Sequence, residues 1–282
     1  MKQIILHTGR CGSTKLWAIL DRYYRAKYNG DTSEGSLKKL NRRYNLLNDN
    51  YFGLFEFYSP RFCEMRVKYP WLTVRVKQKD GLYPGHNITP EQDKIWTDLR
   101  FEAWDYVHHI TCDHFQKNYL IKYPPFSPTY EEERAYHEGR KKLEDFEYNM
   151  PPVDGTDFIV LRRRNKIEQG ISRWLTQKTN LYFTERDRDK TELVERTKKI
   201  YKKRLSFKVP AWAEHTGIIL IDKLMDRLVD HLKKVTINIR EIYYEDIADL
   251  EPYEVLEFMG ITDYEKYLDK DFSIPFIKTW TR

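Results

Sequence analysis

Hydrophobic residues follow two patterns along the chain: short apolar or alternating stretches, and positions spaced three or four residues apart. The short stretches predict buried strands near residues 4–6, 71–77, 158–161 and 235–239. The spaced positions predict helices near residues 16–24, 37–47, 90–109, 166–178 and 212–232. Residues 130–146 are highly charged and predict a solvated helix. Strands that alternate with helices favour an α/β fold with a central parallel sheet and helices on both faces.

A single domain is the expected organisation of the 282 residues. Hydrophobic residues make up 40% of the chain, which is enough for a core, and no linker rich in Pro, Gly and Ser divides it. Residues 122–128 are typical of a proline-rich loop. Residues 181–208 are polar and charged, which predicts a partly mobile helix or a lid.

The charge of the chain narrows the class of partner. A net charge of +6 favours anions, either nucleic acid or phosphorylated and sulfated small ligands. The basic residues form no arm-like tract and no zinc-finger spacing occurs, so nucleic acid is not expected as a partner. His108, His109 and His114 do not match a standard zinc pattern, so no metal is expected.

The cysteines Cys11, Cys63 and Cys112 form neither a disulfide framework nor a Cys-x-x-Cys motif, which indicates a reducing compartment. The first strand begins close to residue 1, without room for a signal peptide. No apolar run reaches the length of about eighteen residues that suggests a membrane helix. We therefore expect a cytoplasmic protein without a membrane partner.

The first predicted strand leads into a loop suited to an anion. Residues 7–14 read His-Thr-Gly-Arg-Cys-Gly-Ser-Thr and precede the first helix. Glycine permits sharp turns with positive φ, and a helix N-terminus presents unpaired N–H groups and a favourable dipole. Ser13 and Thr14 are expected to supply hydroxyls at the helix start. The loop therefore suits phosphate or sulfate, although the same pattern also begins ordinary buried helices.

The spacing of this loop differs from the Walker A pattern Gly-x-x-x-x-Gly-Lys-Ser/Thr. Two residues separate Gly9 from Gly12, and Lys15 follows the hydroxyl residues. A nucleotide kinase needs its lysine before the Ser or Thr so that it reaches the β- and γ-phosphates. A P-loop kinase that uses ATP and magnesium is therefore kept only as the alternative.

A second basic element follows the apolar run at residues 158–161, where Arg162, Arg163 and Arg164 stand in succession. This pattern predicts a buried parallel strand that brings positive charge to the carboxyl edge of the sheet. Ligands bind at that edge in open α/β sheets. The alternative explanation of the arginines is a solvated strand end or a salt-bridge cluster. The next helix is expected to bury Ile167, Ile171, Trp174 and Leu175.

These two stretches together resemble the sulfotransferase superfamily, whose donor is 3'-phosphoadenosine-5'-phosphosulfate (PAPS). The family's 5'-phosphosulfate loop reads as a basic residue, Ser, Gly, Ser or Thr, and Thr, and residues 10–14 depart from it only at Cys11. Its 3'-phosphate site pairs an Arg with a Ser eight residues later, as in Arg164 and Ser172. The segment 171–179 is most similar to the compact bacterial branch that includes trehalose sulfotransferase. The Tyr-Glu-Asp segment at 244–246 is also similar to one in the family.

The resemblance implies a P-loop-type three-layer fold and sulfuryl transfer from PAPS to a small-molecule or carbohydrate hydroxyl. The product would be 3'-phosphoadenosine-5'-phosphate (PAP), and no metal would be needed. The residues implied to bind the donor are Gly9, Arg10, Cys11, Gly12, Ser13, Thr14, Arg164 and Ser172. A binding protein with a lapsed active site is a third possibility, because cysteine stands at a serine position.

The resemblance also suggests a general base. In the bacterial branch a glutamate before two aromatic residues is the proposed base, and Glu56-Phe57-Tyr58 matches it. The animal branch has Lys-Thr-His after its second strand, whereas Lys77-Gln78-Lys79 stands here without a histidine. Glu56 is therefore the expected base, with Glu34 in reserve and Arg10 and Lys77 as further catalytic residues.

Overall fold

A five-stranded parallel sheet forms the centre of the protein, with strand order β2-β3-β1-β4-β6. The computed structural model describes residues 1–32, 50–54, 117–126, 130–146, 150–151, 153–179, 184–185, 211–272, 274 and 276–277. The strands of the sheet are β1 (Lys2–His7), β2 (Tyr51–Leu54), β3 (Asn118–Tyr123), β4 (Asp157–Arg162) and β6 (Ile239–Tyr243). Two short strands, β5 (Thr184–Glu185) and β7 (Phe276–Ile277), pair antiparallel in a separate sheet. The predicted α/β class with a central parallel sheet is confirmed.

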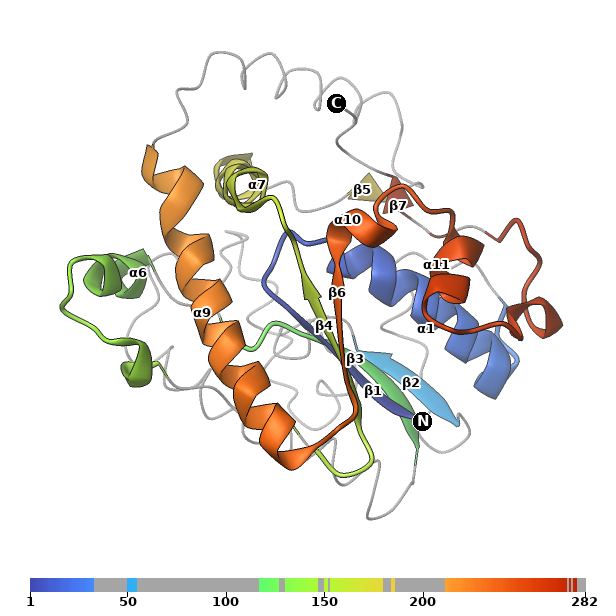
Figure 1. The fold of residues 1–282 in the computed structure, drawn as a ribbon. Coiled ribbons are helices and arrows are strands. Elements are labelled where there is room, and N and C mark those ends of the chain that lie inside the picture. Colours follow the sequence, from blue (N-terminus) through green and yellow to red (C-terminus); the bar gives the residue numbers. More distant parts are fainter. Residues whose placement is uncertain are drawn as a thin grey trace, which may run out of the picture.

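Helices cover both faces of this sheet. They are α1 (Ser13–Asn29), α6 (Tyr130–His137), α7 (Lys166–Thr179), α9 (Ala211–Val235), α10 (Tyr244–Ile247) and α11 (Pro252–Phe258), with 3₁₀ turns at Leu143–Asp145 and Tyr264–Lys266. Figure 1 shows α9 on one side of the sheet and α1 and α11 on the other. The helices predicted at 16–24, 166–178 and 212–232 are confirmed as α1, α7 and α9.

Burial on both faces explains the unbroken apolar run in β4. Phe158 and Val160 join the core cluster that contains α9 residues. Ile159 and Leu161 join the opposite cluster, which contains α1 residues. Successive strand side chains point to opposite faces, so a strand with helices on both sides needs apolar residues at every position.

The helices that follow the neighbouring strands β1 and β4 lie on opposite faces of the sheet. β1 continues into α1 on one face, whereas β4 continues into α7, which packs against α9 on the other face. β1 and β4 are hydrogen-bonded neighbours. The carboxyl ends of these two strands therefore flank a topological switch point, which is where open α/β sheets bind ligands.

The structure corrects the prediction for residues 122–128. Lys122 and Tyr123 complete β3 instead of beginning a loop, and both side chains are buried. The polar residues Asn118 and Lys122 interrupt the apolar pattern of β3, so its sequence lacks a clear strand signal. β2 also went unpredicted, because residues 51–54 are typical of a mixed aromatic segment.

A strand does follow α9, but the bounds predicted for it, residues 235–239, are wrong. α9 continues through Val235, and β6 begins at Ile239, with Ile237 96% exposed between them. Among the described strands β6 lies at one edge of the sheet, where Arg240 and Glu241 remain exposed, so few apolar residues mark it. The helix predicted over 130–146 is also too long, since α6 ends before Gly139, which has a φ of +71°.

Some predicted elements lie outside the described residues. These are the strand at 71–77, the helices at 37–47 and 90–109, and the segment 181–208 apart from β5.

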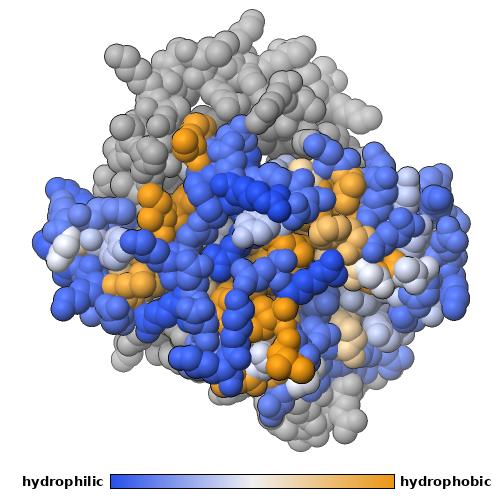
Figure 2. Space-filling view, in the orientation of Figure 1, coloured by the Kyte–Doolittle hydropathy of each residue, from blue (hydrophilic) through white to orange (hydrophobic). Residues whose placement is uncertain are grey.

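Hydrophilic residues predominate in the coloured part of Figure 2, with smaller hydrophobic areas between them. The large hydrophobic side chains exposed in the described part of the chain are Ile167, Ile219, Val235 and Ile237. None of the helices in that part has the length and apolar character needed to cross a membrane.

The packing of α9 on the sheet can be tested by truncating one buried side chain. Leu228 is fully buried, so Leu228→Ala should lower the free energy of unfolding by about 2–5 kcal/mol. The matched control is Ile219→Ala on the same helix, where 40% exposure limits the expected loss to about 1 kcal/mol. Denaturant unfolding followed by circular dichroism measures both variants. Equal losses would contradict the orientation of α9.

Candidate functional site

The loop between β1 and α1 follows a strained backbone path. Gly9, Arg10 and Gly12 have φ angles of +75°, +51° and +74°, in the left-handed region. In the described ranges, Arg10 is the one non-glycine residue with positive φ. That conformation costs an L-residue about 1–2 kcal/mol. Such residues persist where the surrounding structure holds them, and they concentrate at ligand-binding sites.

α1 begins directly at this loop. Gly12 is the N-cap residue, and its carbonyl accepts the N–H of Leu16 at 3.2 Å. Ser13 and Thr14 are the first two helical residues, so their hydroxyls lie at the helix start as expected, while Gly12 holds the N-cap position. The Oγ1 atom of Thr14 accepts a hydrogen bond from the Nζ atom of Lys122 at 3.1 Å.

Lys122 is a site residue that the sequence analysis did not identify. It lies near the carboxyl end of β3, which is hydrogen-bonded to β1, and only 2% of it is exposed. Its ammonium group places positive charge beside the start of α1. A lysine shortly before Pro124 and Pro125 is typical of a loop, so only the pairing of β3 in the sheet reveals its position.

Lys15 follows the hydroxyl residues and is engaged at the end of α10. Its Nζ atom donates to the carbonyl oxygens of Ile247, Ala248 and Leu250 at 3.1, 3.1 and 2.6 Å. These contacts hold the lysine as a cap on α10. They do not give it the role of the Walker A lysine, which reaches the nucleotide phosphates.

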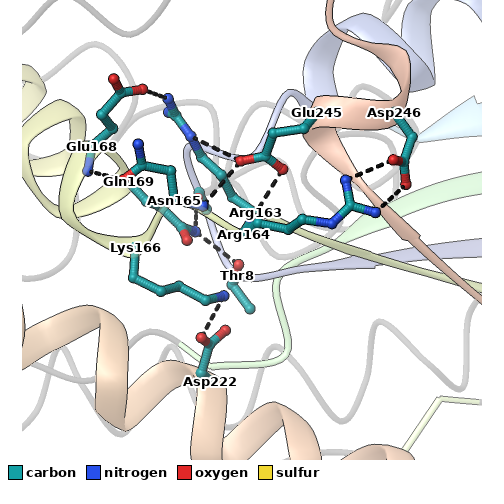
Figure 3. Close-up of polar contacts among 11 residues, drawn as sticks. Thr8, Arg163, Arg164, Asn165, Lys166, Glu168, Gln169, Asp222, Glu245 and Asp246 are labelled. Carbon is teal, nitrogen blue, oxygen red and sulfur yellow. Dashed lines mark hydrogen bonds and ion pairs between the residues drawn. The ribbon is translucent and has the colours of Figure 1, made fainter.

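α7 contributes a buried polar residue to the loop. Gln169 is fully buried and donates through Nε2 to the Oγ1 atom of Thr8 at 2.8 Å, as Figure 3 shows, and to the carbonyl of Gly9. The prediction that Ile167 belongs to the core face of α7 is wrong, since this side chain is 48% exposed. α7 packs over the loop as well as against α9, so it turns Gln169 inward.

The loop and α7 meet again at two residues from the predicted donor site. The Nε atom of Arg10 donates a hydrogen bond to the Oγ atom of Ser172 at 3.0 Å, across 162 positions of sequence. The structure thus brings these two residues together near the carboxyl ends of β1 and β4.

The three arginines at the end of β4 are engaged by carboxylates. The ion pairs are Arg162 with Asp226 and Glu241, Arg163 with Glu168 and Glu245, and Arg164 with Asp246. Figure 3 shows those of Arg163 and Arg164. The alternative of a salt-bridge cluster is therefore correct as a description of these contacts. The side chain of Arg164 is nevertheless 52% exposed and remains accessible to a ligand.

The carboxylates that hold this turn are ionised at neutral pH. Hydrogen bonds from Arg164 lower the pKa of Asp246 below its usual value. Burial alone would raise the pKa of Glu245, but the backbone N–H groups of Arg164 and Asn165 donate to its carboxylate and bring the net pKa below the usual value.

Tyr244 connects the loop to the arginine cluster. A Cβ atom on Gly12 would overlap the Tyr244 ring, with Cε2 at 2.8 Å. The guanidinium of Arg163 lies over the same ring, 5.0 Å from its centroid, within the range of a cation–π contact. Glycine is therefore required at position 12 both by its φ angle and by this close approach.

The Cys11 side chain belongs to the core cluster on the α1 side and is fully buried. Burial raises the pKa of its thiol, while hydrogen bonds from Thr8 and Ser13 offset part of this effect. Cys11 is therefore a protonated, packed side chain, and any contact with an anion would have to come from its backbone.

His7 ends β1 as a neutral residue. Its Nδ1 atom accepts the N–H of Gly9 at 3.2 Å, and only 5% of the residue is exposed. Burial, with a smaller contribution from the charge of Lys122, lowers the pKa of His7 well below its usual value of 6.5.

Three predicted residues, Glu56, Glu34 and Lys77, lie outside the described part of the chain. Their roles stay predictions. Within the described ranges, no group of three or more His, Cys, Asp and Glu side chains is arranged to hold a metal ion.

The packing of Tyr244 on Gly12 can be tested with a pair of glycine substitutions. Gly30 ends α1 with a φ of +67° and open space around the position of a Cβ. Gly30→Ala should therefore lower the free energy of unfolding only by the cost of the left-handed backbone conformation, about 1–2 kcal/mol. Gly12→Ala should lose at least about 1 kcal/mol more, because the alanine also displaces Tyr244. Denaturant unfolding measures both losses, and Tyr244→Ala should rescue the excess in the double variant. Equal losses without rescue would contradict the contact.

The neutral state of His7 predicts a pH dependence of stability. The unfolded chain protonates this histidine near pH 6.5 and the folded chain does not, so acidification favours the unfolded state. Between pH 7.5 and 5.5 the wild type should lose about 1.4 kcal/mol more stability than His7→Asn, which keeps an acceptor for Gly9. Urea unfolding at the two pH values measures this difference, and parallel losses would show that His7 titrates normally in the fold.

No family model and no curated protein matches the chain. Among solved structures, the sulfotransferase domain from the curacin biosynthetic pathway is similar, with a TM-score of 0.33 and 14% sequence identity over 96% of this chain and 75% of that chain. A similarity of this size assigns neither a family nor an activity to the protein.

Proposed function

We propose that the protein is a sulfotransferase that moves a sulfuryl group from PAPS to a hydroxyl of a carbohydrate or another small molecule. The observation that carries this proposal is the hydrogen bond between Arg10 and Ser172. PAPS has a phosphosulfate at one end and a 3'-phosphate at the other, so it needs two anion sites close to each other. Arg10 belongs to the motif for the first, and Ser172 to the motif for the second.

The loop and the cations beside it are suited to the phosphosulfate. Glycines at positions 9 and 12 let backbone N–H groups approach an anion, as in other loops at helix N-termini. Arg10 and Lys122 add positive charge from the loop and from β3. In a site of this kind, charge growing on the departing phosphate is stabilised by fixed donors.

Arg164 and Ser172 are assigned to the 3'-phosphate. The side chain of Arg164 is half exposed, and Ser172 lies two turns into α7, near Arg10. A charge-assisted contact from Arg164 would distinguish this donor from adenine nucleotides without a 3'-phosphate.

The reaction is an in-line displacement at sulfur. The acceptor oxygen forms a bond to sulfur while the bond from sulfur to the bridging phosphate oxygen breaks, and PAP leaves with the electron pair. The acceptor proton passes to a general base, for which Glu56 is proposed and Glu34 is the alternative. Lys77 is proposed to assist with charge at the reacting group.

A P-loop kinase is the less favoured alternative. Its mechanism needs a loop lysine at the β- and γ-phosphates, and Lys15 instead donates to three carbonyl oxygens around the end of α10. Binding of PAP without magnesium would support sulfuryl transfer, whereas binding of ATP that requires magnesium would support the kinase.

Arg10→Ala tests the proposed reaction directly. Loss of a donor to the developing charge should reduce sulfuryl transfer by about a hundredfold, measured with sulfur-labelled PAPS and a panel of carbohydrate and phenolic acceptors. The matched control is Arg140→Ala, which removes a 61%-exposed arginine that pairs with Glu138 outside the site. Near-normal turnover in Arg10→Ala would exclude Arg10 from the mechanism. No transfer by the wild type to any acceptor, together with no PAP binding, would exclude the proposed function.

A further inference from the structure

α10 contacts both proposed anion sites through three consecutive residues. Tyr244 packs on Gly12 in the loop after β1. Glu245 and Asp246 both engage the turn after β4. The four-residue helix therefore lies between the two places where the ends of the donor are proposed to bind.

Glu245 fixes the backbone of the turn that carries Arg164. Its two carboxylate oxygens each accept one N–H group, from Arg164 and from Asn165, both at 3.0 Å. Asn165 in turn accepts the N–H of Glu168 through Oδ1 at 3.1 Å, at the start of α7. The carboxylate thus sets both the path of the turn and the point where α7 begins.

Asp246 fixes the side chain of Arg164. Its Oδ1 and Oδ2 atoms accept from Nη1 and Nη2 at 2.6 and 3.1 Å, so the pair is end-on and bidentate (Figure 3). The guanidinium also lies 4.3 Å from the centroid of the Tyr243 ring. Asp246 is itself held, because Oδ2 accepts the backbone N–H of Tyr243 at 3.3 Å. The carboxylate of Asp246 and the ring of Tyr243 together therefore define the plane of the guanidinium.

The end-on pairing leaves part of the guanidinium available. A guanidinium has five N–H donors, and Asp246 takes one from each Nη atom. The Nε–H group and the second hydrogen of Nη2 form another parallel fork on the side of the group. Such a fork matches two oxygens of a phosphate.

We infer that Asp246 is a positioning residue that gives the site its preference for a nucleotide with a 3'-phosphate, by holding the free fork of Arg164 in place. Glu245 supports the same arrangement by fixing the backbone of the turn. This inference rests on the proposed function, since it assigns Arg164 to the 3'-phosphate. It predicts that Asp246 acts through Arg164 alone and affects only ligands that carry that phosphate.

Calorimetric titration of the full chain with PAP and with adenosine 5'-phosphate tests the inference, because the two ligands differ only in the 3'-phosphate. Asp246→Asn keeps the size of the side chain but replaces one accepting oxygen with an amide that cannot accept from Nη2. Affinity for PAP should fall about tenfold, the effect expected for a charge-assisted hydrogen bond. Affinity for adenosine 5'-phosphate should stay within about twofold.

Asp226→Asn is the matched control. Asp226 pairs with Arg162 in the same cluster, and its substitution makes the same change in net charge. It should leave both affinities unchanged. If Asp226→Asn weakened PAP as much as Asp246→Asn does, the effect would come from net charge, and the assignment to Asp246 would be overturned.

A double-variant cycle separates positioning from general structural damage. Arg164→Lys keeps the charge but has no second fork, so adding Asp246→Asn to it should cause no further loss of PAP affinity. Unchanged or tighter PAP binding in Asp246→Asn alone would show that the aspartate competes with the phosphate, which overturns the inference. An equal loss of affinity for both nucleotides would assign Asp246 a structural role and would also overturn the inference. If the wild type binds both nucleotides equally, the assignment of a 3'-phosphate site is excluded, and with it this part of the proposed function.

Discussion

The parallel pairing of β1 with β4 is the interaction on which the candidate site depends. The register sets His7 beside Leu161, so both strands end at the same level and their loops leave the sheet together. The first loop turns toward α1 and the second toward α7, on opposite faces. Arg10 and Ser172 can touch only because the two connections begin at adjacent strand ends and then diverge.

Apolar periodicity predicted the elements that are buried on a clear pattern. β4 is an unbroken apolar run, and α9 repeats its buried residues at helical spacing, so both are evident in the sequence. The elements that were not predicted contain polar residues whose burial or exposure is set by the tertiary structure. β3 buries Lys122 against the start of α1, and the edge strand β6 exposes charged residues. No local pattern distinguishes such strands from loops.

The candidate site likewise contains residues that the sequence predicted and contacts that only the tertiary structure reveals. The residue types and spacing in the loop, and the eight positions from Arg164 to Ser172, were visible in the sequence. The partners of these residues were not. Gln169 is a polar residue in an amphipathic stretch, and its bond to Thr8 depends on how that helix packs over the loop. The carboxylates on Arg164 come from a helix about eighty positions later.

Lys15 and Tyr244 couple the short helix α10 to the start of α1. Its ammonium group ties the first turn of α1 to the carbonyl oxygens at the end of α10, and Tyr244 presses the beginning of α10 against Gly12. α10 is thus fastened to α1 at both of its ends. Because α10 also holds the turn after β4 through Glu245 and Asp246, the loop after β1, the start of α1 and that turn form one connected unit, and a displacement of α10 would move all three.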